Sequence, residues 1–427
     1  MMQLFKLWLN RSSQVKWVLL DQILVSGMNF FTGVLLARFL GVEGYGQFVV
    51  LYAVLLYVNI YQSALIVAPM LSIVPQMNSE VERINYFKGV ITVQILFSVI
   101  ISLSILYLGS EIEKSYPLVN AKNSLLPLAT SILLFQLQEW LRRYYFICRK
   151  GKNVFFNDFV SYGGQIALLF LLNKLGNLSI ANAFWAIAAS SATAFLIGLL
   201  TEDIWPVPSY AIPVFKRSWK FGRDLLFSGQ IYWASSQGIL ILSAAILGSK
   251  AAGGIRAAQN IVGPVNILFQ GMENIIPIQA AQHYNQNYLA GLTKYLKKVG
   301  LVGGLLLALP CIIVAIFSTQ LIELAYSKTY TAYASLIVWQ ATIALIGFFR
   351  MQAFYFFRTT GYTKEIVLNT IISCVIVYIL TGICVYQLQE TGIMLALMVG
   401  EAVGLIAVLW AIRKHCKRFR ASVISPK

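Results

Sequence analysis

Long runs of apolar residues, separated by short polar segments, dominate the pattern of this chain. Four of these runs contain no Asp, Glu, Lys or Arg: residues 175–201, 225–249, 299–322 and 366–389. A helix needs about 20 residues to cross a hydrocarbon core of about 30 Å, and each run is long enough. The pattern predicts an all-α, polytopic membrane protein of about twelve spans, numbered 1 to 12, which begin near Val18, Phe48, Phe87, Ser124, Val154, Leu178, Leu225, Ile255, Val299, Tyr333, Lys364 and Thr391.

The composition supports a membrane protein. Of 427 residues, 58% are hydrophobic and 11% are charged, whereas soluble domains average about 45–50% apolar and about 25% charged residues. The run after Lys16 begins late and carries Asp21, so no cleavable signal peptide is predicted. Residues 1–16 form either an interfacial helix or a frayed tail. Five isolated cysteines and two histidines argue against a disulfide, a metal site or another cofactor.

The distribution of basic residues predicts the orientation in the membrane. With the N-terminus inside, 26 of the 33 Lys and Arg residues fall on the cytoplasmic side. Cytoplasmic segments of membrane proteins carry such an excess of basic residues. Both termini are therefore predicted to lie in the cytoplasm, with the spans in the inner membrane of the cell. The net charge of +17 then reflects a basic face against anionic lipids rather than a nucleic-acid partner.

The two halves of the chain look duplicated. Gly46, Gln62 and Pro69 recur at the same spacing as Gly254, Gln270 and Pro277, at an offset of 208 residues. Two six-helix lobes, residues 1–208 and 209–427, are therefore predicted as parallel repeats around a transport path. Pro69 and Pro277 are candidate hinges because proline kinks a helix, and static packing kinks are the alternative. Spans 2 and 8 are predicted to line the path because they carry further polar residues: Asn59, Tyr61, Asn260, Asn266 and Asn274.

Three arginines lie within or near the ends of spans. Glu139 and Arg143 are four residues apart and are predicted to pair, which would leave Arg142 free to point elsewhere. Arg142, Arg143 and Arg350 either bind a phosphate or pyrophosphate, for which a guanidinium is suited, or extend to the inner interface. Arg350 is the strongest single candidate, and Arg256 of span 8 is a further candidate for binding cargo.

Other polar residues in the spans have two interpretations each. The acidic residues either take up a proton or Na⁺ that drives transport, or pair with arginines between helices. They are Asp21, Glu139, Asp158, Glu273 and Glu401. Gln62 and Gln270 either hydrogen-bond a sugar or join neighbouring helices.

Motifs in spans 1 and 2 carry a family resemblance. Residues 36–41 read Leu-Ala-Arg-Phe-Leu-Gly and residues 43–48 read Glu-Gly-Tyr-Gly-Gln-Phe. With Gly254 in the second half, they resemble the polysaccharide transporter branch of the multidrug/oligosaccharidyl-lipid/polysaccharide exporter superfamily. The resemblance implies a flippase that carries undecaprenyl-pyrophosphate-linked oligosaccharides outward for lipopolysaccharide or exopolysaccharide synthesis. It also implies structural roles for Arg38, Gly41 and Gly46.

Three alternatives remain at this stage. A drug/cation antiporter of the same superfamily would use the acidic residues, whereas the lipid II flippase branch usually has fourteen spans. A membrane-embedded saccharide polymerase or ligase would need a catalytic constellation and a long outer loop, and the longest outer segment here is residues 109–123. The expected partners of a carrier are the lipid-linked saccharide, membrane lipids, and glycosyltransferases or a polymerase of the same pathway.

Overall fold

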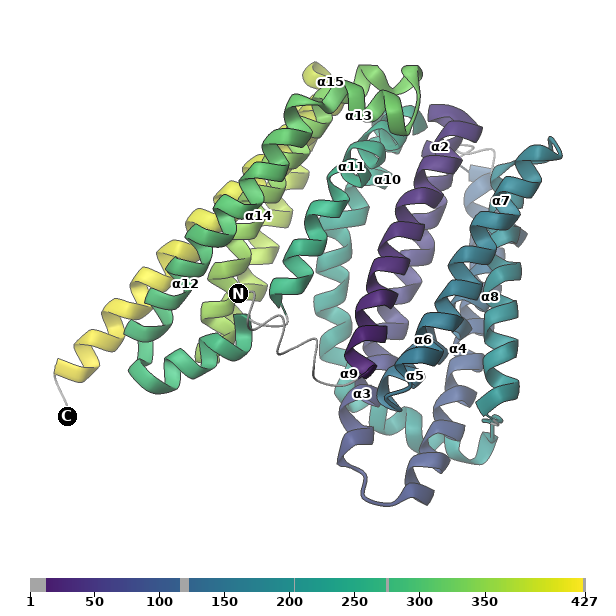
Figure 1. Ribbon diagram of the computed structural model, residues 1–427, viewed down its shortest axis with the longest axis horizontal. Helices are drawn as coiled ribbons and strands as arrows, with labels where there is room; N and C mark the ends of the chain where they lie inside the picture. Colours follow the sequence, from purple (N-terminus) through teal and green to yellow (C-terminus); the bar gives the residue numbers. More distant parts are fainter. Residues whose placement is uncertain (1–12, 116–122, 203, 274–275, 425–427) are drawn as a thin grey trace. The chain divides into compact units, whose positions relative to one another are not determined.

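The structure is a computed structural model that describes residues 13–115, 123–202, 204–273 and 276–424. Two compact units make up the chain, residues Met1–Trp233 and Ala234–Lys427. In each unit, long helices run alongside one another (Figure 1). All regular elements in the described ranges are helical.

The first unit contains spans 1 to 6 and the first half of span 7. Gly41, with φ of 70°, separates span 1 from span 2 within α2. The elements in order are α2 (Ser13–Gln62), η1 (Ser63–Val67), α3 (Ala68–Ile73), η2 (Val74–Gln76), α4 (Glu80–Ser115), α5 (Leu125–Ile147), α6 (Gly151–Asp158), η3 (Phe159–Gly163), α7 (Gly164–Lys174), α8 (Ile180–Glu202), η4 (Pro208–Tyr210) and α9 (Ala211–Trp233).

The second unit contains the rest of span 7 and spans 8 to 12. Its long helices are interrupted at Tyr288, with φ of 48°, and at Gln389, with φ of 50°. The elements in order are η5 (Ala234–Gly238), α10 (Ile239–Leu247), α11 (Ser249–Glu273), α12 (Ile276–Ile316), α13 (Ser318–Ala325), η6 (Lys328–Tyr333), α14 (Ala334–Thr360) and α15 (Lys364–Ile424).

The predicted fold class is confirmed: this is an all-α, multi-pass membrane protein. Eight stretches of the described chain are long and apolar enough to span a bilayer. Two of them each contain two spans, which are separated at Gly41 and at Gln389. Together with α5 and α11, which have 23 and 25 residues, they account for the twelve predicted spans.

Several helices begin well before the predicted positions. Span 7 begins at Ala211 instead of Leu225, and the helix that contains span 9 begins at Ile276 instead of Val299. Hydropathy marks only the apolar part of a helix, whereas the first turns of these helices carry polar residues, such as Lys216 and Arg217 in α9 and Gln279 and His283 in α12. Of the predicted interfacial segment 1–16, only residues 13–16 lie within the described chain, and they begin α2.

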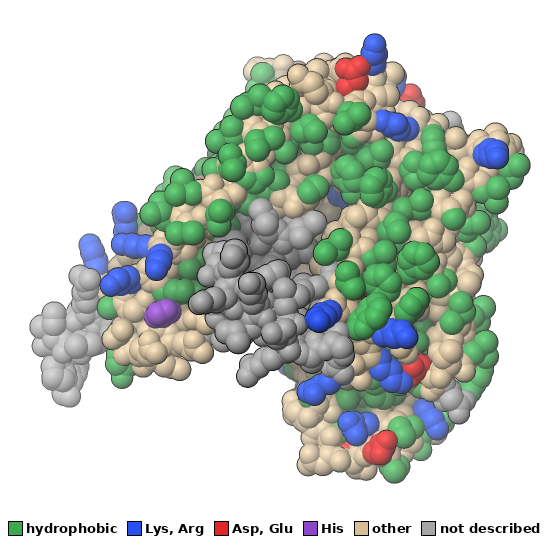
Figure 2. Space-filling view, in the orientation of Figure 1, with side chains coloured by type: hydrophobic (Ala, Val, Ile, Leu, Met, Phe, Trp, Pro, Cys, Tyr) green, Lys and Arg blue, Asp and Glu red, His purple; other side chains and the backbone are tan. Residues whose placement is uncertain are grey.

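Lipid-facing surfaces follow the helix period. On α4, Leu96, Ile100, Leu103 and Tyr107 are each at least half exposed, and residues three or four apart share one face of a helix. Figure 2 shows hydrophobic side chains spread over the visible face of each unit, with most visible charges toward the helix ends. Such a surface is suited to a hydrocarbon solvent.

The two packing units do not divide at the same place as the sequence repeat. The repeat divides near residue 208, whereas the units divide at Trp233, inside span 7. The first half of span 7, α9, packs on α4 and η1, and the second half, α10, packs on α11 and α15. Close approach explains the first contact, because a Cβ at Gly222 would lie 2.2 Å from the carbonyl oxygen of Ala64.

Within the described ranges, three spans contain a turn of π-helix. These turns are η1 in span 2, η3 in span 5 and η5 in span 7. Single π-turns inside α-helices occur frequently at functional sites. Here, η1 follows Gln62, η3 follows Asp158 and η5 follows Trp233, so each turn adjoins a polar or aromatic side chain that is part of the sites described next.

Candidate functional site

The central helix of each unit carries a buried arginine. In the first unit, α5 packs on α4, α8, α6 and α2; in the second, α14 packs on α12, α15, α11 and α13. Arg142 on α5 is 8% exposed and Arg350 on α14 is 7% exposed. Both guanidinium groups are buried between helices rather than extended along the protein surface. A buried charge in a membrane protein needs partners, and both arginines have them.

Arg142 binds three carboxylates from three spans. Its Nη2 lies 3.0 Å from Asp21 Oδ2, its Nε lies 2.5 Å from Asp158 Oδ2, and its Nη1 lies 3.6 Å from Glu139 Oε2. The predicted pair of Glu139 and Arg143 is confirmed, at 2.6 Å between Oε1 and Nη2. The prediction that this pair leaves Arg142 free is wrong, because Asp21 and Asp158 converge on it from spans 1 and 5.

Among the described residues, the charges of this cluster do not balance. Its three carboxylates face two guanidinium groups, so the fully ionised cluster carries one excess negative charge. Asp21 is 1% exposed, Asp158 is fully buried, and Glu139 is 4% exposed. A net charge in the hydrocarbon region is costly, so uptake of one proton or one monovalent cation would stabilise the cluster.

Arg350 has a smaller set of partners. Its Nη1 lies 2.9 Å from Glu401 Oε1, and its Nε donates a 2.9 Å hydrogen bond to Asn369 Oδ1. Asn369 Nδ2 in turn donates to the carbonyl oxygen of Gly404 at 2.8 Å. These contacts join spans 10, 11 and 12. Of the two interpretations of Glu401, the structure therefore supports an interhelical partner for an arginine, and Arg350 as a cargo ligand stays a prediction.

Gly404 makes room for the Arg350 guanidinium. A Cβ at this position would lie 2.8 Å from Arg350 Nε and 2.9 Å from its Cζ. Real Cβ atoms do not approach heavy atoms this closely without displacing them. The residue is therefore part of the arginine site although it carries no side chain.

Gln62 joins three helices instead of facing an open path. The side chain is fully buried, and its Nε2 donates to Gln94 Oε1 at 3.0 Å and to the carbonyl oxygen of Gln136 at 2.5 Å. These residues belong to spans 2, 3 and 4. Of the two interpretations of Gln62, helix cross-linking is the one that the contacts support.

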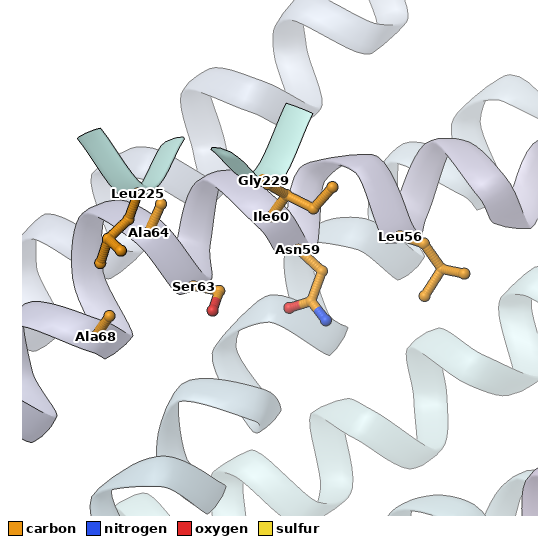
Figure 3. A pocket seen from close by; sticks show the side chains of 8 residues that line it. All are labelled: Leu56, Asn59, Ile60, Ser63, Ala64, Ala68, Leu225 and Gly229. Carbon is orange, nitrogen blue, oxygen red and sulfur yellow. The ribbon is translucent and has the colours of Figure 1, made fainter. Parts of the chain in front are cut away.

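A cavity of about 530 Å³ lies between span 2 and α9. Figure 3 shows Asn59 and Ser63 pointing to the same side of the span 2 helix, with Leu225 and Gly229 contributed by α9. An aromatic cluster on the same two helices, Tyr57, Tyr61 and Trp233, lies next to these positions in the chain. Sequence reasoning identified Asn59 and Tyr61 as polar positions, but Trp233 was missed because an isolated Trp carries no positional signal.

The remaining candidates have the following placements. Arg256 is half-buried, with Nη1 3.4 Å from Gln259 Oε1. Arg38 is exposed and Gly46 is buried. Gly254 packs against the Tyr333 ring, 2.2 Å from where its Cβ would lie. Pro69 follows η1, and Pro277 is the second residue of α12.

The side chains of Gln270 and Glu273 lie outside the described part. No metal-binding group of three His, Cys, Asp or Glu occurs in the described ranges.

The family follows from a match that covers most of the chain. A family profile described as "Polysaccharide biosynthesis protein" matches residues 35–335. The chain belongs to this polysaccharide biosynthesis protein family. The resemblance of the span 1 and span 2 motifs to the polysaccharide branch is thereby confirmed. A search of the curated proteins gave no match.

Solved structures share the fold of this family member. An inward-facing multidrug resistance MATE transporter of the MOP superfamily has a TM-score of 0.70 at 14% identity, covering 95% of this chain and 99% of that one. The lipid II flippase MurJ, in an inward closed conformation, has a TM-score of 0.69 at 14% identity, covering 93% and 87%. A MOP superfamily transporter from Pyrococcus furiosus has a TM-score of 0.63 at 12% identity, covering 93% and 94%. These likenesses show that the chain shares its fold with these transporters and with the flippase.

Proposed function

We propose that this protein is a flippase that moves a lipid-linked oligosaccharide across the cytoplasmic membrane during synthesis of a cell-surface polysaccharide. The family match over residues 35–335 carries the proposal. The cargo has a polyprenyl pyrophosphate carrier, and it is taken from the inner leaflet to the outer leaflet by alternating access of two lobes. The protein acts as a carrier and not as an enzyme, with both termini in the cytoplasm.

The architecture suits such a carrier. In alternating access, each unit moves largely as a rigid body while the transport path opens first to one side of the membrane and then to the other. Arg142 ties spans 1, 4 and 5 together, and Arg350 ties spans 10, 11 and 12 together. Each unit therefore has polar contacts that hold its helices together. Such contacts matter in a membrane, because the hydrophobic effect does not drive helices together in hydrocarbon.

The excess carboxylate at Arg142 supplies a means of coupling. A proton or a Na⁺ that neutralises the cluster would change the contacts among spans 1, 4 and 5. Binding that differs between two conformations shifts the equilibrium between them. We propose that cargo movement is driven by ion uptake at this cluster, and that glycosyltransferases or a polymerase of the same pathway act before and after the carrier.

Deletion of the gene tests the function. The expected result is accumulation of a lipid-linked oligosaccharide on the inner leaflet, reversed by the full-length gene and not by an empty vector. Lipid-linked saccharides extracted from both strains would be compared by mass spectrometry. Unchanged lipids together with altered tolerance to cationic drugs would overturn the proposal in favour of the antiporter.

A further inference from the structure

The last helix, α15, carries a stripe of exposed side chains that changes from apolar to basic along its length. Ile406 is 67% exposed and Trp410 is 62% exposed, and Arg413, Lys414 and Lys417 are exposed in the turns that follow. Each of these five residues lies three or four positions from another, so they share one face of the helix. At about 1.5 Å per residue, the stripe is about 16 Å long, which is close to the depth of one leaflet.

Contacts on the opposite face of α15 fix the direction in which the stripe points. The His415 ring lies 4.2 Å from the Tyr362 ring and 5.9 Å from the Phe356 ring, between centroids. Val408, seven residues before His415 and therefore on the same face, is 1% exposed and belongs to the hydrophobic core that contains Phe356. Since this face packs on α14, the stripe is turned toward the surface of the second unit.

Trp410 and Lys414 contact each other where the stripe changes from apolar to basic. Lys414 Nζ lies 4.9 Å from the centroid of the Trp410 ring, within the range of a cation–π interaction. Tryptophan is enriched at the level of the lipid head groups because its ring is apolar and its N–H is polar. An ammonium group has three N–H donors, so Lys414 can contact the ring and still donate to a phosphate oxygen.

The positive charge at this end of the second unit is not neutralised by acidic residues of the described chain. Residues 276–298, 351–368 and 405–417 contain one acidic residue, Glu365, and eight basic residues: Lys294, Lys297, Lys298, Arg358, Lys364, Arg413, Lys414 and Lys417. None of the eight forms an ion pair within the described ranges. In the first unit, by contrast, Arg143, Lys150 and Arg217 each pair with a glutamate. Figure 2 shows Lys and Arg side chains gathered at the end of the second unit that carries the C-terminus, with no Asp or Glu side chain among them on the visible face.

A phospholipid with an anionic head group matches the whole stripe. Its acyl chain would lie along Ile406 and Trp410, and its phosphate would be within reach of Arg413, Lys414 and Lys417. Basic clusters directly beside a membrane span bind anionic lipids in this way. A soluble phosphate, or an acidic segment of a soluble protein, would use the basic end and leave the apolar end without a partner. A zwitterionic lipid would bring a positive charge of its own.

We propose that the stripe on α15, residues Ile406, Trp410, Arg413, Lys414 and Lys417, binds an anionic phospholipid of the inner leaflet. The phosphate takes the guanidinium of Arg413 and the ammonium groups of Lys414 and Lys417 as partners. Trp410 lies at the boundary between the head group and the acyl chain. The proposal goes beyond the proposed transport function and does not depend on it.

Competition for a labelled lipid tests the site in the purified, full-length protein. Binding of tritium-labelled dioleoyl phosphatidylglycerol in detergent would be measured by scintillation proximity. Dioleoyl phosphatidylcholine, with the same acyl chains and a neutral head group, is expected to compete about tenfold more weakly than unlabelled phosphatidylglycerol. The triple variant Arg413→Gln, Lys414→Gln and Lys417→Gln is expected to bind the labelled lipid about tenfold more weakly than wild type.

The matched control removes three charges from the same end of the second unit. It is the triple variant Lys294→Gln, Lys297→Gln and Lys298→Gln on α12, whose lysines are also exposed. At physiological ionic strength, which screens charges outside the stripe, this control should bind the lipid within about twofold of wild type. Thermal unfolding would show that both variants stay folded, as expected for exposed positions. Wild-type binding by the stripe variant, equal losses in the two variants, or equal competition by the two lipids would overturn the site.

Two further competitors distinguish a lipid from other anionic partners. Millimolar inorganic phosphate and a polyglutamate peptide, added at constant ionic strength, should leave lipid binding unchanged, because neither has an acyl chain to contact Ile406 and Trp410. Displacement by phosphate would indicate a site for a soluble anion, and displacement by the peptide would indicate a docking surface for an acidic protein. Either result would overturn the assignment to a lipid.

Discussion

Arg142 and Arg350 lie 208 residues apart, the offset of the sequence repeat, and their guanidinium groups make corresponding contacts. Nε of Arg142 faces Asp158 of span 5, and Nε of Arg350 faces Asn369 of span 11. Each guanidinium carbon also lies over the ring of the phenylalanine four residues later, at 5.3 and 5.2 Å from its centroid. The repeat therefore preserves a buried arginine that links two neighbouring spans.

The partners differ in charge. Asp158 is an acid, whereas Asn369 is neutral. Arg350 and Glu401 balance each other, whereas the cluster at Arg142 has one carboxylate more than it has guanidinium groups. For the described residues, this asymmetry favours the first unit as the place of the proposed ion coupling.

Asp158→Asn should remove the excess charge and retain a side chain that can hydrogen-bond. The expected variant folds, reaches normal abundance and loses the dependence of export on pH or Na⁺. Export would be measured across a series of external pH values and Na⁺ concentrations. The control is Glu82→Gln, which removes an exposed carboxylate 3.8 Å from Arg217. An ion dependence as strong as in the wild type would exclude Asp158 from coupling.

Arg350→Met and Glu401→Gln should be destabilising as single changes and milder in combination. Each single variant leaves one charge of a largely buried pair without its partner, which costs about 3 kcal/mol for Arg350→Met. A coupling free energy of about 1–2 kcal/mol is expected from the double-mutant cycle. Thermal unfolding in detergent would measure it. Strictly additive effects would show that the 2.9 Å contact contributes little.

Gly404→Ala should displace the Arg350 guanidinium, because the new methyl group would lie 2.8 Å from Nε. Overpacking of this kind costs about 1–3 kcal/mol, which thermal unfolding would detect. Gly382→Ala, on the same helix and with nothing within 4 Å, is the matched control. It should be neutral or stabilising by up to about 1 kcal/mol. Equal stability of the two variants would contradict the close approach.

Gln62→Leu should weaken the link among spans 2, 3 and 4. The loss of two buried hydrogen bonds, which leaves the Gln94 Oε1 acceptor unpaired, is expected to cost about 1–3 kcal/mol. Folded Gln62→Leu protein should bind the saccharide within twofold of wild type, where the saccharide is the one released by mild acid from the lipid that accumulates in the deletion strain. A selective loss of saccharide binding at unchanged stability would instead restore Gln62 as a sugar ligand.

Local patterns in the sequence sufficed to predict much of the fold. The apolar runs predict the twelve spans because lipid requires each segment to be long and to satisfy its own backbone. The spacing of Glu139 and Arg143 predicts their pair, since both lie on one helix face.

Local sequence patterns do not predict partners that are distant in the sequence. Asp21 meets Arg142 across 121 residues, and no spacing rule selects it over the other intramembrane acids. Hydropathy also does not reveal that Arg142 and Arg350 are buried in ion pairs, because it scores each residue without its partners. The π-turns leave no compositional signal, so the division of span 7 at Trp233 could not be anticipated.

The most direct test of the central claim is a leaflet assay with purified protein in liposomes. Lipid-linked oligosaccharide from the deletion strain would be incorporated, and its exposure to an added membrane-impermeant periodate reagent would be followed with time. We predict that wild-type protein exposes the initially protected fraction when a pH or Na⁺ gradient is applied, and that protein-free liposomes do not. Identical, slow exposure with and without the protein, under both gradients, would contradict the account.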